Sequence, residues 1–148
     1  MTYSTPSSSL VLPSQPLRSL PLHFSAACLT GALATDIAYW QTAEMVWANF
    51  SAWLLTAGLV LGFIAAIAVL IDLTTGRLHL DGVGWLYILG NLAVFVVALF
   101  NAFIHSRDAW TSVVPIGLTL SAVAVILMVI NAVMGRLLQR QRSKVYVS

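Results

Sequence analysis

Residues 49–73 read NFSAWLLTAGLVLGFIAAIAVLIDL, and this stretch decides the fold class. Between Phe50 and Ile71 it holds no charged residue and no proline. A transmembrane helix needs about 20 mainly apolar residues to cross a hydrocarbon core roughly 30 Å thick. No element of a soluble domain of this size needs so much unbroken apolar surface. The stretch is therefore predicted to be a membrane span.

The composition of the whole chain agrees with a membrane protein. Hydrophobic residues make up 59% of the 148 residues and charged residues only 8%, whereas soluble domains average about 25% charged residues. The length allows one domain. The chain has one cysteine, Cys28, so it cannot form an intrachain disulfide. We expect Cys28 to be an inert small side chain within a helix.

Three further apolar stretches flank the central one and are predicted to be its partner spans. They run over Leu20–Tyr39, Trp85–His105 and Val113–Gly135, with connections at Trp40–Ala48, Thr74–Gly84 and Ser106–Ser112. The chain then divides into a disordered Ser- and Pro-rich tail over 1–19, a four-span transmembrane domain over 20–136 and a basic tail over 137–148. The predicted fold class is an all-α integral membrane four-helix bundle.

The distribution of lysine and arginine predicts the orientation of the bundle. With four spans, both termini and the middle connection share one side of the membrane. That side holds six basic residues, Arg18, Arg77, Arg136, Arg140, Arg142 and Lys144, and the other side holds only Arg107. The positive-inside rule places both termini in the cytoplasm, with the protein in the inner membrane. A basic tail could also bind nucleic acid, but it is far more often the flank of a last span.

Each predicted span carries a stripe of small or polar residues on one helical face. Such stripes favour helix contacts in lipid, because association there relies on close packing and interhelical hydrogen bonds. The stripes are Ser51, Gly58, Gly62, Ala65 and Asp72 in the second span; Gly117, Ser121, Ala124, Asn131 and Gly135 in the fourth; Asn91, Ala98, Asn101 and His105 in the third; and His23, Ala27, Gly31 and Thr35 in the first. Glycine and alanine are common in spans, but four independent stripes favour a bundle. Asp36 falls off its stripe, which favours contact with water at the helix end.

Placing an ionisable side chain within a membrane span costs free energy, so each such residue is a candidate functional residue. They fall into two layers by depth: His23, Asp72, Arg77 and His79 on the inner side, and Asp36, Asn101, His105, Arg107 and Asp108 on the outer side. Each could be a small proton or ion site, or a satisfied interfacial pair, such as Asp72 with the following loop or with His23. For each residue, the satisfied interfacial pair is favoured over a proton or ion site.

A haem ligated by histidines from facing helices is a sharper alternative. The two histidines that ligate one iron must lie at the same depth in the membrane. His23 and His105 are expected in opposite leaflets and so cannot share an iron. His23 and His79 are expected on the same side, but His79 is in a loop. The sequence holds no Cys/His cluster, phosphate-binding loop or nucleophile elbow. It therefore predicts no catalytic residue and no metal site.

Several of these residues also carry a resemblance to a known family. They are His23-Phe24 and Asp36 in the first span, Gly58 and Gly62 in a span that ends at Asp72, Asn91, Arg107, and Pro115-x-Gly117 with Ser121. In this pattern the chain resembles domain-of-unknown-function family 2231, a family of small bacterial membrane proteins. The resemblance implies a four-span inner-membrane protein and implies no particular activity.

Three functions remain open from the sequence. The leading hypothesis is a non-enzymatic scaffold or accessory subunit, because the chain combines four spans and short loops with no catalytic constellation. A haem-binding redox subunit is the second, and a small proton or ion conductor that uses Asp36 and Asp72 is the third. The expected partners are the lipid bilayer and a membrane protein or a second copy of the chain, with no nucleic acid.

Overall fold

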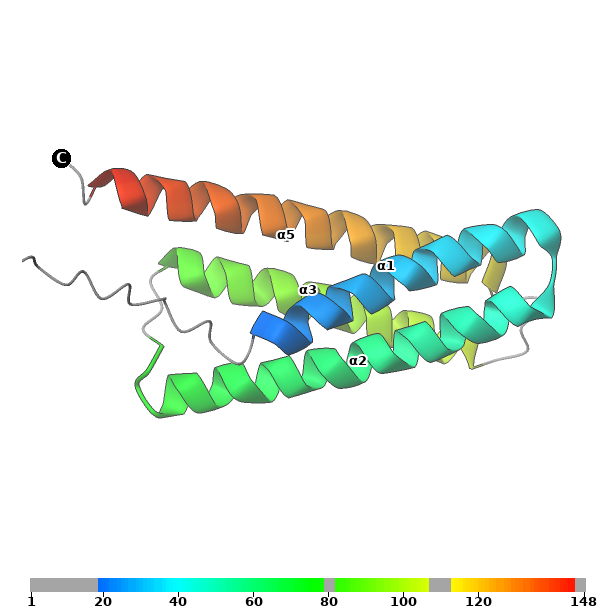
Figure 1. The fold of residues 1–148 in the computed structure, drawn as a ribbon, viewed down its shortest axis with the longest axis horizontal. Coiled ribbons are helices and arrows are strands. Elements are labelled where there is room, and N and C mark those ends of the chain that lie inside the picture. Colours follow the sequence, from blue (N-terminus) through cyan, green and yellow to red (C-terminus); the bar gives the residue numbers. More distant parts are fainter. Residues whose placement is uncertain (1–18, 79–81, 107–112, 146–148) are drawn as a thin grey trace, which may run out of the picture.

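The computed structural model describes residues 19–78, 82–106 and 113–145, and these residues form helices and no strand. The elements are α1 (Ser19–Thr42), α2 (Met45–Thr74), α3 (Gly82–His105), a short π-helix η1 (Val113–Gly117) and α5 (Leu118–Val145) (Figure 1). Helix η1 leads directly into α5. The predicted tail before Ser19, and the candidate residues Arg107, Asp108 and His79, lie outside the described residues.

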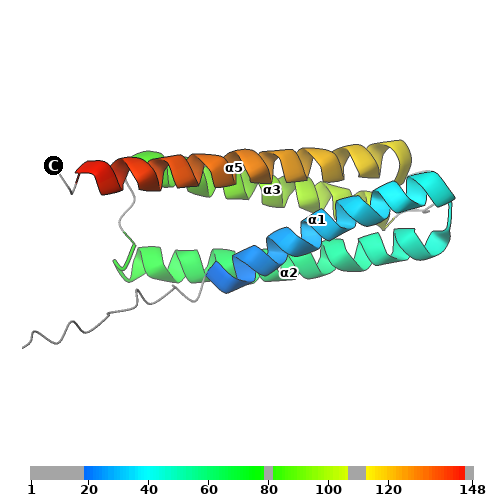
Figure 2. The same ribbon diagram turned by 45° about the horizontal axis from the view of Figure 1, so that its top comes forward.

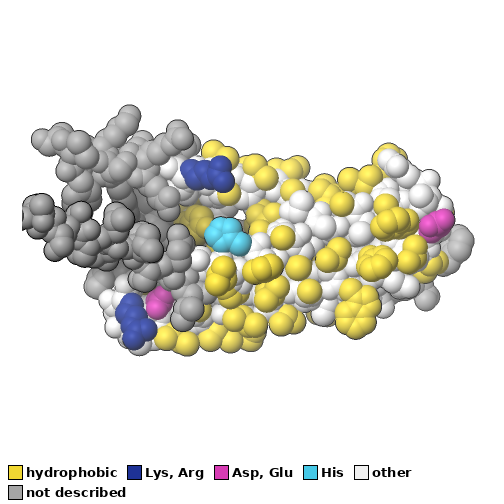
Figure 3. Space-filling view, in the orientation of Figure 1, with side chains coloured by type: hydrophobic (Ala, Val, Ile, Leu, Met, Phe, Trp, Pro, Cys, Tyr) yellow, Lys and Arg dark blue, Asp and Glu magenta, His cyan; other side chains and the backbone are white. Residues whose placement is uncertain are grey.

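Three helical stretches are long and apolar enough to cross a membrane: Met45–Thr74, Gly84–His105 and Val113–Arg136. Figure 3 shows hydrophobic side chains over the middle of the molecule and charged side chains toward its ends. Large apolar side chains such as Phe63, Leu92 and Ile126 are more than half exposed, as expected where lipid replaces water as solvent. Helix α1 has the length of a span, 24 residues, but carries more polar side chains.

The helices run alternately up and down. Figures 1 and 2 show that the start of α1, the end of α2, the start of α3 and the end of α5 lie at one end of the bundle. We call it the Ser19 end, and the opposite end, which holds the α1–α2 connection, the Ala43 end. Helix α1 packs against α2 and α5, and α3 packs against α5 and α2. The apolar core contains Leu29, Ala32, Leu55, Val94 and Ala98.

The contact stripes predicted for the second, third and fourth spans largely coincide with the buried faces. The structure buries Ser51, Gly58, Ala65, Ala98, Asn101, His105, Gly117, Ser121, Ala124 and Asn131. Gly62, Asp72, Asn91 and Gly135 are half-buried. These faces bury small and polar side chains and leave large apolar ones exposed, which is the pattern expected of helices that meet in lipid.

The stripe predicted for the first span is wrong. His23 and Ala27 are exposed, and the buried residues of α1 are Ser25, Leu29, Ala32, Asp36 and Tyr39. This face lies roughly 140° around the helix from the predicted one, at about 100° per residue. It is the contact face because its polar groups find partners on other helices. One example is Ser25, whose hydroxyl donates to the carbonyl of Gly58 at 2.7 Å.

The connection predicted over Trp40–Ala48 is also too long. Helix α1 continues to Thr42 and α2 begins at Met45, so only Ala43 and Glu44 join them. Ala43 has a left-handed backbone (φ 54°) and donates its N–H to the carbonyl of Tyr39 at 2.8 Å. Glu44 donates its N–H to the hydroxyl of Thr42 at 3.3 Å. These local bonds satisfy helix-end groups and allow a two-residue turn.

We predict that Gly58→Leu destabilises the bundle, while Ala57→Leu at the neighbouring exposed position does not. A Cβ at Gly58 would lie 3.1 Å from Leu29 Cδ2 and 3.3 Å from the Cβ of Cys28, which cannot rotate away. Overpacking of this kind costs about 1–3 kcal/mol. The measurement is the melting temperature in detergent. Equal shifts for the two variants would show that α1 and α2 do not meet at Gly58.

Candidate functional site

Five polar side chains meet inside the bundle near the Ala43 end. They are Asp36 of α1, Ser51 of α2, Asn101 and His105 of α3, and Ser121 of α5, and we call them the Asp36 cluster. All five are buried, and Asp36, Ser51 and Asn101 are fully inaccessible to solvent. Each of the four long helices contributes at least one member.

The lengths of the helices bring these side chains to one depth. Asp36 lies six residues before Thr42, the end of α1, and Ser51 lies six residues after Met45, the start of α2. Because the turn between them has only two residues, both side chains sit about 9 Å from the Ala43 end at about 1.5 Å per residue. His105 is the last residue of α3, and Ser121 is in the first turn of α5.

The carboxylate of Asp36 is the centre of the hydrogen-bond network. Its Oδ1 accepts from the hydroxyl of Ser51 and lies 2.9 Å from His105 Nε2. Its Oδ2 accepts from the hydroxyl of Ser121 at 2.5 Å. Ser121 Oγ in turn accepts from Asn101 Nδ2 at 2.7 Å. Hydroxyls and imidazole therefore surround the carboxylate with donors, as a buried ionisable group requires.

The partners of His105 assign its protons. Its Nδ1 lies 3.0 Å from the backbone carbonyl of Asn101, which can only accept, so Nδ1 carries a hydrogen. Nε2 lies 2.9 Å from Asp36 Oδ1, so a proton on Nε2 can be donated to the buried carboxylate. Such a bond lowers the cost of placing the carboxylate among apolar helices.

Apolar layers lie on both sides of the Asp36 cluster. On the side of the Ser19 end is the core formed by Leu29, Ala32, Leu55, Val94 and Ala98. On the side of the Ala43 end a second group, Tyr39, Ala48 and Val113, is packed by Trp47 and Val114. The cluster is thus enclosed between two apolar layers.

The order of contacts in the cluster differs from that of a Ser-His-Asp catalytic triad. In a triad the carboxylate holds one ring nitrogen of the histidine and the serine faces the other. Here Asp36 and Ser51 both face Nε2 of His105, the serine at 3.2 Å, and a backbone carbonyl holds Nδ1. Ser51 and Asp36 therefore share one ring nitrogen, which differs from the geometry that activates a serine in a triad.

The expectation that Asp36 faces water is wrong, because its side chain is fully buried. The sequence signal that would have revealed this is helical register: Asp36 shares one face of α1 with Ser25, Leu29, Ala32 and Tyr39. Asn101 and His105 were expected in the same outer layer as Asp36, and the structure brings them together with it. Ser51 and Ser121 were singled out only as packing residues, and the structure makes them donors to the carboxylate.

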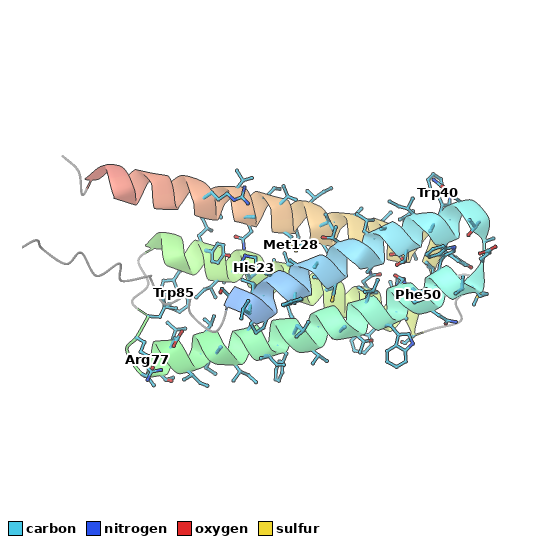
Figure 4. All side chains as sticks on the ribbon, in the orientation of Figure 1. His23, Trp40, Phe50, Arg77, Trp85 and Met128 are labelled. Carbon is cyan, nitrogen blue, oxygen red and sulfur yellow. The ribbon has the colours of Figure 1, made fainter. Side chains whose placement is uncertain are left out.

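The remaining candidates lie away from the cluster. His23 is exposed near the Ser19 end, where its Nδ1 lies 2.5 Å from the carbonyl of Ser19 (Figure 4). Asp72 and Arg77 lie where α2 ends, and the carbonyl of Asp72 accepts from the N–H of Leu78 at 3.0 Å. Asn91 donates to the carbonyl of Tyr87 at 2.9 Å. His23 and His105 thus lie toward opposite ends of the bundle.

A second polar contact, between the side chain of Asn131 on the predicted stripe and the backbone of α3, joins α3 and α5. Asn131 Nδ2 donates to the carbonyl of Tyr87 at 3.2 Å. Its Oδ1 lies so close to Gly90 that a Cβ there would overlap it. Gly90 is therefore required for this close approach.

The sequence model of a family described as Predicted membrane protein (DUF2231) matches residues 14–147, nearly the whole chain. The chain belongs to this family. Membership in DUF2231 confirms the resemblance seen in the sequence and agrees with the three long apolar helices in identifying a membrane protein. No curated protein and no solved structure matches the chain.

We predict that Asp36 and His105 stabilise this DUF2231 bundle as a coupled pair. Asp36→Asn or His105→Gln leaves a buried partner without its charge-assisted bond, which costs about 1–3 kcal/mol. Because either single change breaks the same bond, the double variant should cost clearly less than the sum. The melting temperature in detergent measures this, with Glu44→Gln as an exposed acidic control. Additive costs would show that the two side chains do not interact.

Proposed function

We propose that this DUF2231 protein is a non-enzymatic scaffold or accessory subunit of a membrane assembly. In this proposal it crosses the bacterial inner membrane four times, with both termini in the cytoplasm. The observation that carries the proposal is the enclosure of the Asp36 cluster. The carboxylate of Asp36 accepts from side chains of the three other long helices, and apolar layers separate the cluster from both ends of the bundle.

Helix α1 is proposed as the fourth span despite its polar residues. A helix of 24 residues is about 36 Å long, enough to cross the hydrocarbon core. The charge that opposes insertion most is that of Asp36, and this carboxylate is hydrogen-bonded to side chains of the other helices inside the bundle. His23 lies in the first turns of α1, where a polar ring can reach the membrane surface.

The two alternative functions receive less support from the geometry. A conductor needs a continuous polar path, and the core of Leu29, Ala32, Leu55, Val94 and Ala98 lies between the Asp36 cluster and the Ser19 end. A haem needs free imidazole nitrogens at one depth. Both ring nitrogens of His105 face acceptors within the bundle, and His23 lies at the other end.

The proposed topology predicts a labelling pattern for single cysteines in a Cys28→Ala background. A membrane-impermeant thiol reagent on whole cells should label Cys at Ala43 and Ser106, and should leave Cys at Ser19 and Thr75 unlabelled until the membrane is opened. The reason is the excess of basic residues on the Ser19 side. Labelling at Ser19 and Thr75 but not at Ala43 and Ser106 in intact cells would show that the charge argument chose the wrong side. Labelling at both Ser19 and Ala43 would show that α1 does not cross the membrane.

The proposed accessory role predicts that the chain belongs to a larger particle in its native membrane. Extracted at native expression level in a mild detergent, it should migrate at a higher mass than the purified chain in the same detergent. Light scattering behind size-exclusion chromatography measures both masses. Equal masses, corresponding to a single chain, would overturn the accessory role while leaving the fold untouched.

A further inference from the structure

We propose that the Ser19 end of the bundle holds a binding site for an anionic phospholipid, between the α1–α2 pair of helices and the α3–α5 pair. In this site the acyl chains lie between the two pairs, and the phosphate faces Arg136 of α5. Lipid binding of this kind goes beyond the scaffold role and does not depend on it. Three features carry it: the divergence of the two pairs, the burial of their contact faces and the charges at this end.

The two helix pairs meet at the Ala43 end and diverge toward the Ser19 end (Figures 1 and 2). At the Ala43 end the Asp36 cluster joins all four long helices. Farther along the bundle α2 still approaches α3, because a Cβ on Gly62 would lie 3.3 Å from Cδ2 of Phe95. Beyond this level Figures 1 and 2 show the end of α2 and the start of α3 well apart.

Within each pair, in contrast, the helices stay in contact toward the Ser19 end. In the α3–α5 pair, Asn131 donates to the carbonyl of Tyr87, and a Cβ on Gly135 would lie 3.1 Å from Cε2 of Tyr87. In the α1–α2 pair, a Cβ on Gly62 would lie 3.2 Å from the hydroxyl oxygen of Ser25, in the second turn of α1. The opening therefore lies between the pairs rather than within either of them.

The contact faces of α2 and α3 continue into this opening without being covered. The face of α2 that is buried at Ala65 continues one turn later at Val69, which is only half-buried. The face of α3 that is buried at Val94 continues two turns earlier at Tyr87, which is also half-buried. Beyond Ala65 in α2 and before Val94 in α3, no described residue is buried. In a membrane, a face that no helix covers is covered by lipid chains.

The depth of the opening matches the thickness of one leaflet. From Ala65 to Thr74, where α2 ends, the helix rises about 14 Å, and from Gly82, where α3 begins, to Val94 it rises about 18 Å. Half of a hydrocarbon core roughly 30 Å thick is about 15 Å. The acyl chains of a phospholipid in the leaflet at the Ser19 end therefore span the opening.

The charges at the mouth of the opening favour an anionic headgroup. Figure 3 shows arginine side chains and a histidine together on one face of this end. They belong to Arg136 of α5, Arg77 just after α2 and His23 of α1, all of which are exposed. Asp72, a carboxylate at the same end, is half-buried and already engaged in an interaction. Basic groups between transmembrane helices suit the headgroups of anionic lipids.

Arg136 is the arginine assigned to the phosphate. It directly follows Gly135, where α5 packs on the ring of Tyr87, so it lies just beyond the last contact of the α3–α5 pair. Trp85 lies just beyond the same contact on α3 and is exposed (Figure 4). Tryptophan side chains lie at the level of the headgroups. A guanidinium at that level can bind a phosphate through two parallel hydrogen bonds.

The test is native mass spectrometry of the purified full-length chain in detergent, titrated with phosphatidylglycerol or with phosphatidylcholine of the same acyl chains. The two lipids differ in the net charge of the headgroup. Phosphatidylglycerol should bind about fivefold more tightly or better, the ratio expected from one basic residue at a membrane surface. Equal binding of the two lipids would overturn the proposal. A lipid-free dimer would also overturn it, because a second copy of the chain would then fill the opening.

Substitutions of arginine test the headgroup contact. Arg136→Gln should weaken the binding of phosphatidylglycerol about fivefold and leave that of phosphatidylcholine unchanged. Arg136→Lys, which keeps the charge, should retain most of the affinity. The matched control is Arg142→Gln, which removes the same charge about 9 Å farther along α5. Equal losses in Arg136→Gln and Arg142→Gln would mean a general effect of net charge and would contradict the site.

Substitutions on α2 test the position of the acyl chains. Val69→Trp should fill the opening and abolish the preference for phosphatidylglycerol, whereas Leu70→Trp should retain it, because Leu70 is exposed on the outside of the bundle. If Val69→Trp does not fold, Arg136→Gln still decides the question, because Arg136 is exposed. Unchanged binding in both Val69→Trp and Arg136→Gln would show that the lipid binds elsewhere.

Discussion

One carboxylate dictates the arrangement of this bundle. Asp36 is fully buried among apolar helices, where an isolated charge is too costly to keep. It is compatible with the bundle because α2, α3 and α5 each bring a donor to it, from Ser51, His105 and Ser121. The lengths of the helices and the two-residue turn at Ala43 place these donors at one depth. The same contacts fix the rotation of all four helices about their own axes.

Much of the fold could be predicted from the sequence, because the length and hydropathy of each apolar run depend only on neighbouring residues. The three long apolar helices lie where the apolar runs of the sequence place them, and the contact faces of α2, α3 and α5 follow the stripes of small and polar residues. These contact faces can be predicted because helices in lipid approach each other most closely where their side chains are small. The proposed orientation rests on the distribution of charge alone.

The face of α1 and the role of Asp36 could not be read in the same way. Helix α1 has small or polar residues all around it, so local pattern offers two faces of similar quality. The choice between them depends on partners distant in sequence: His105 and Ser121 lie 69 and 85 residues beyond Asp36. Only the tertiary arrangement shows which of the two faces finds hydrogen-bond partners on the other helices.

The two-residue turn between α1 and α2 has a consequence for biogenesis. In the proposed four-span topology it commits the first two helices to enter the bilayer as one hairpin, in which the strongly apolar α2 carries the more polar α1. Within that hairpin Asp36 can reach Ser51, but His105 and Ser121 are synthesised later. The amino-terminal half therefore holds an uncompensated carboxylate until the carboxy-terminal half arrives. A chain that stops after Thr74 would expose this defect to the quality control of the membrane.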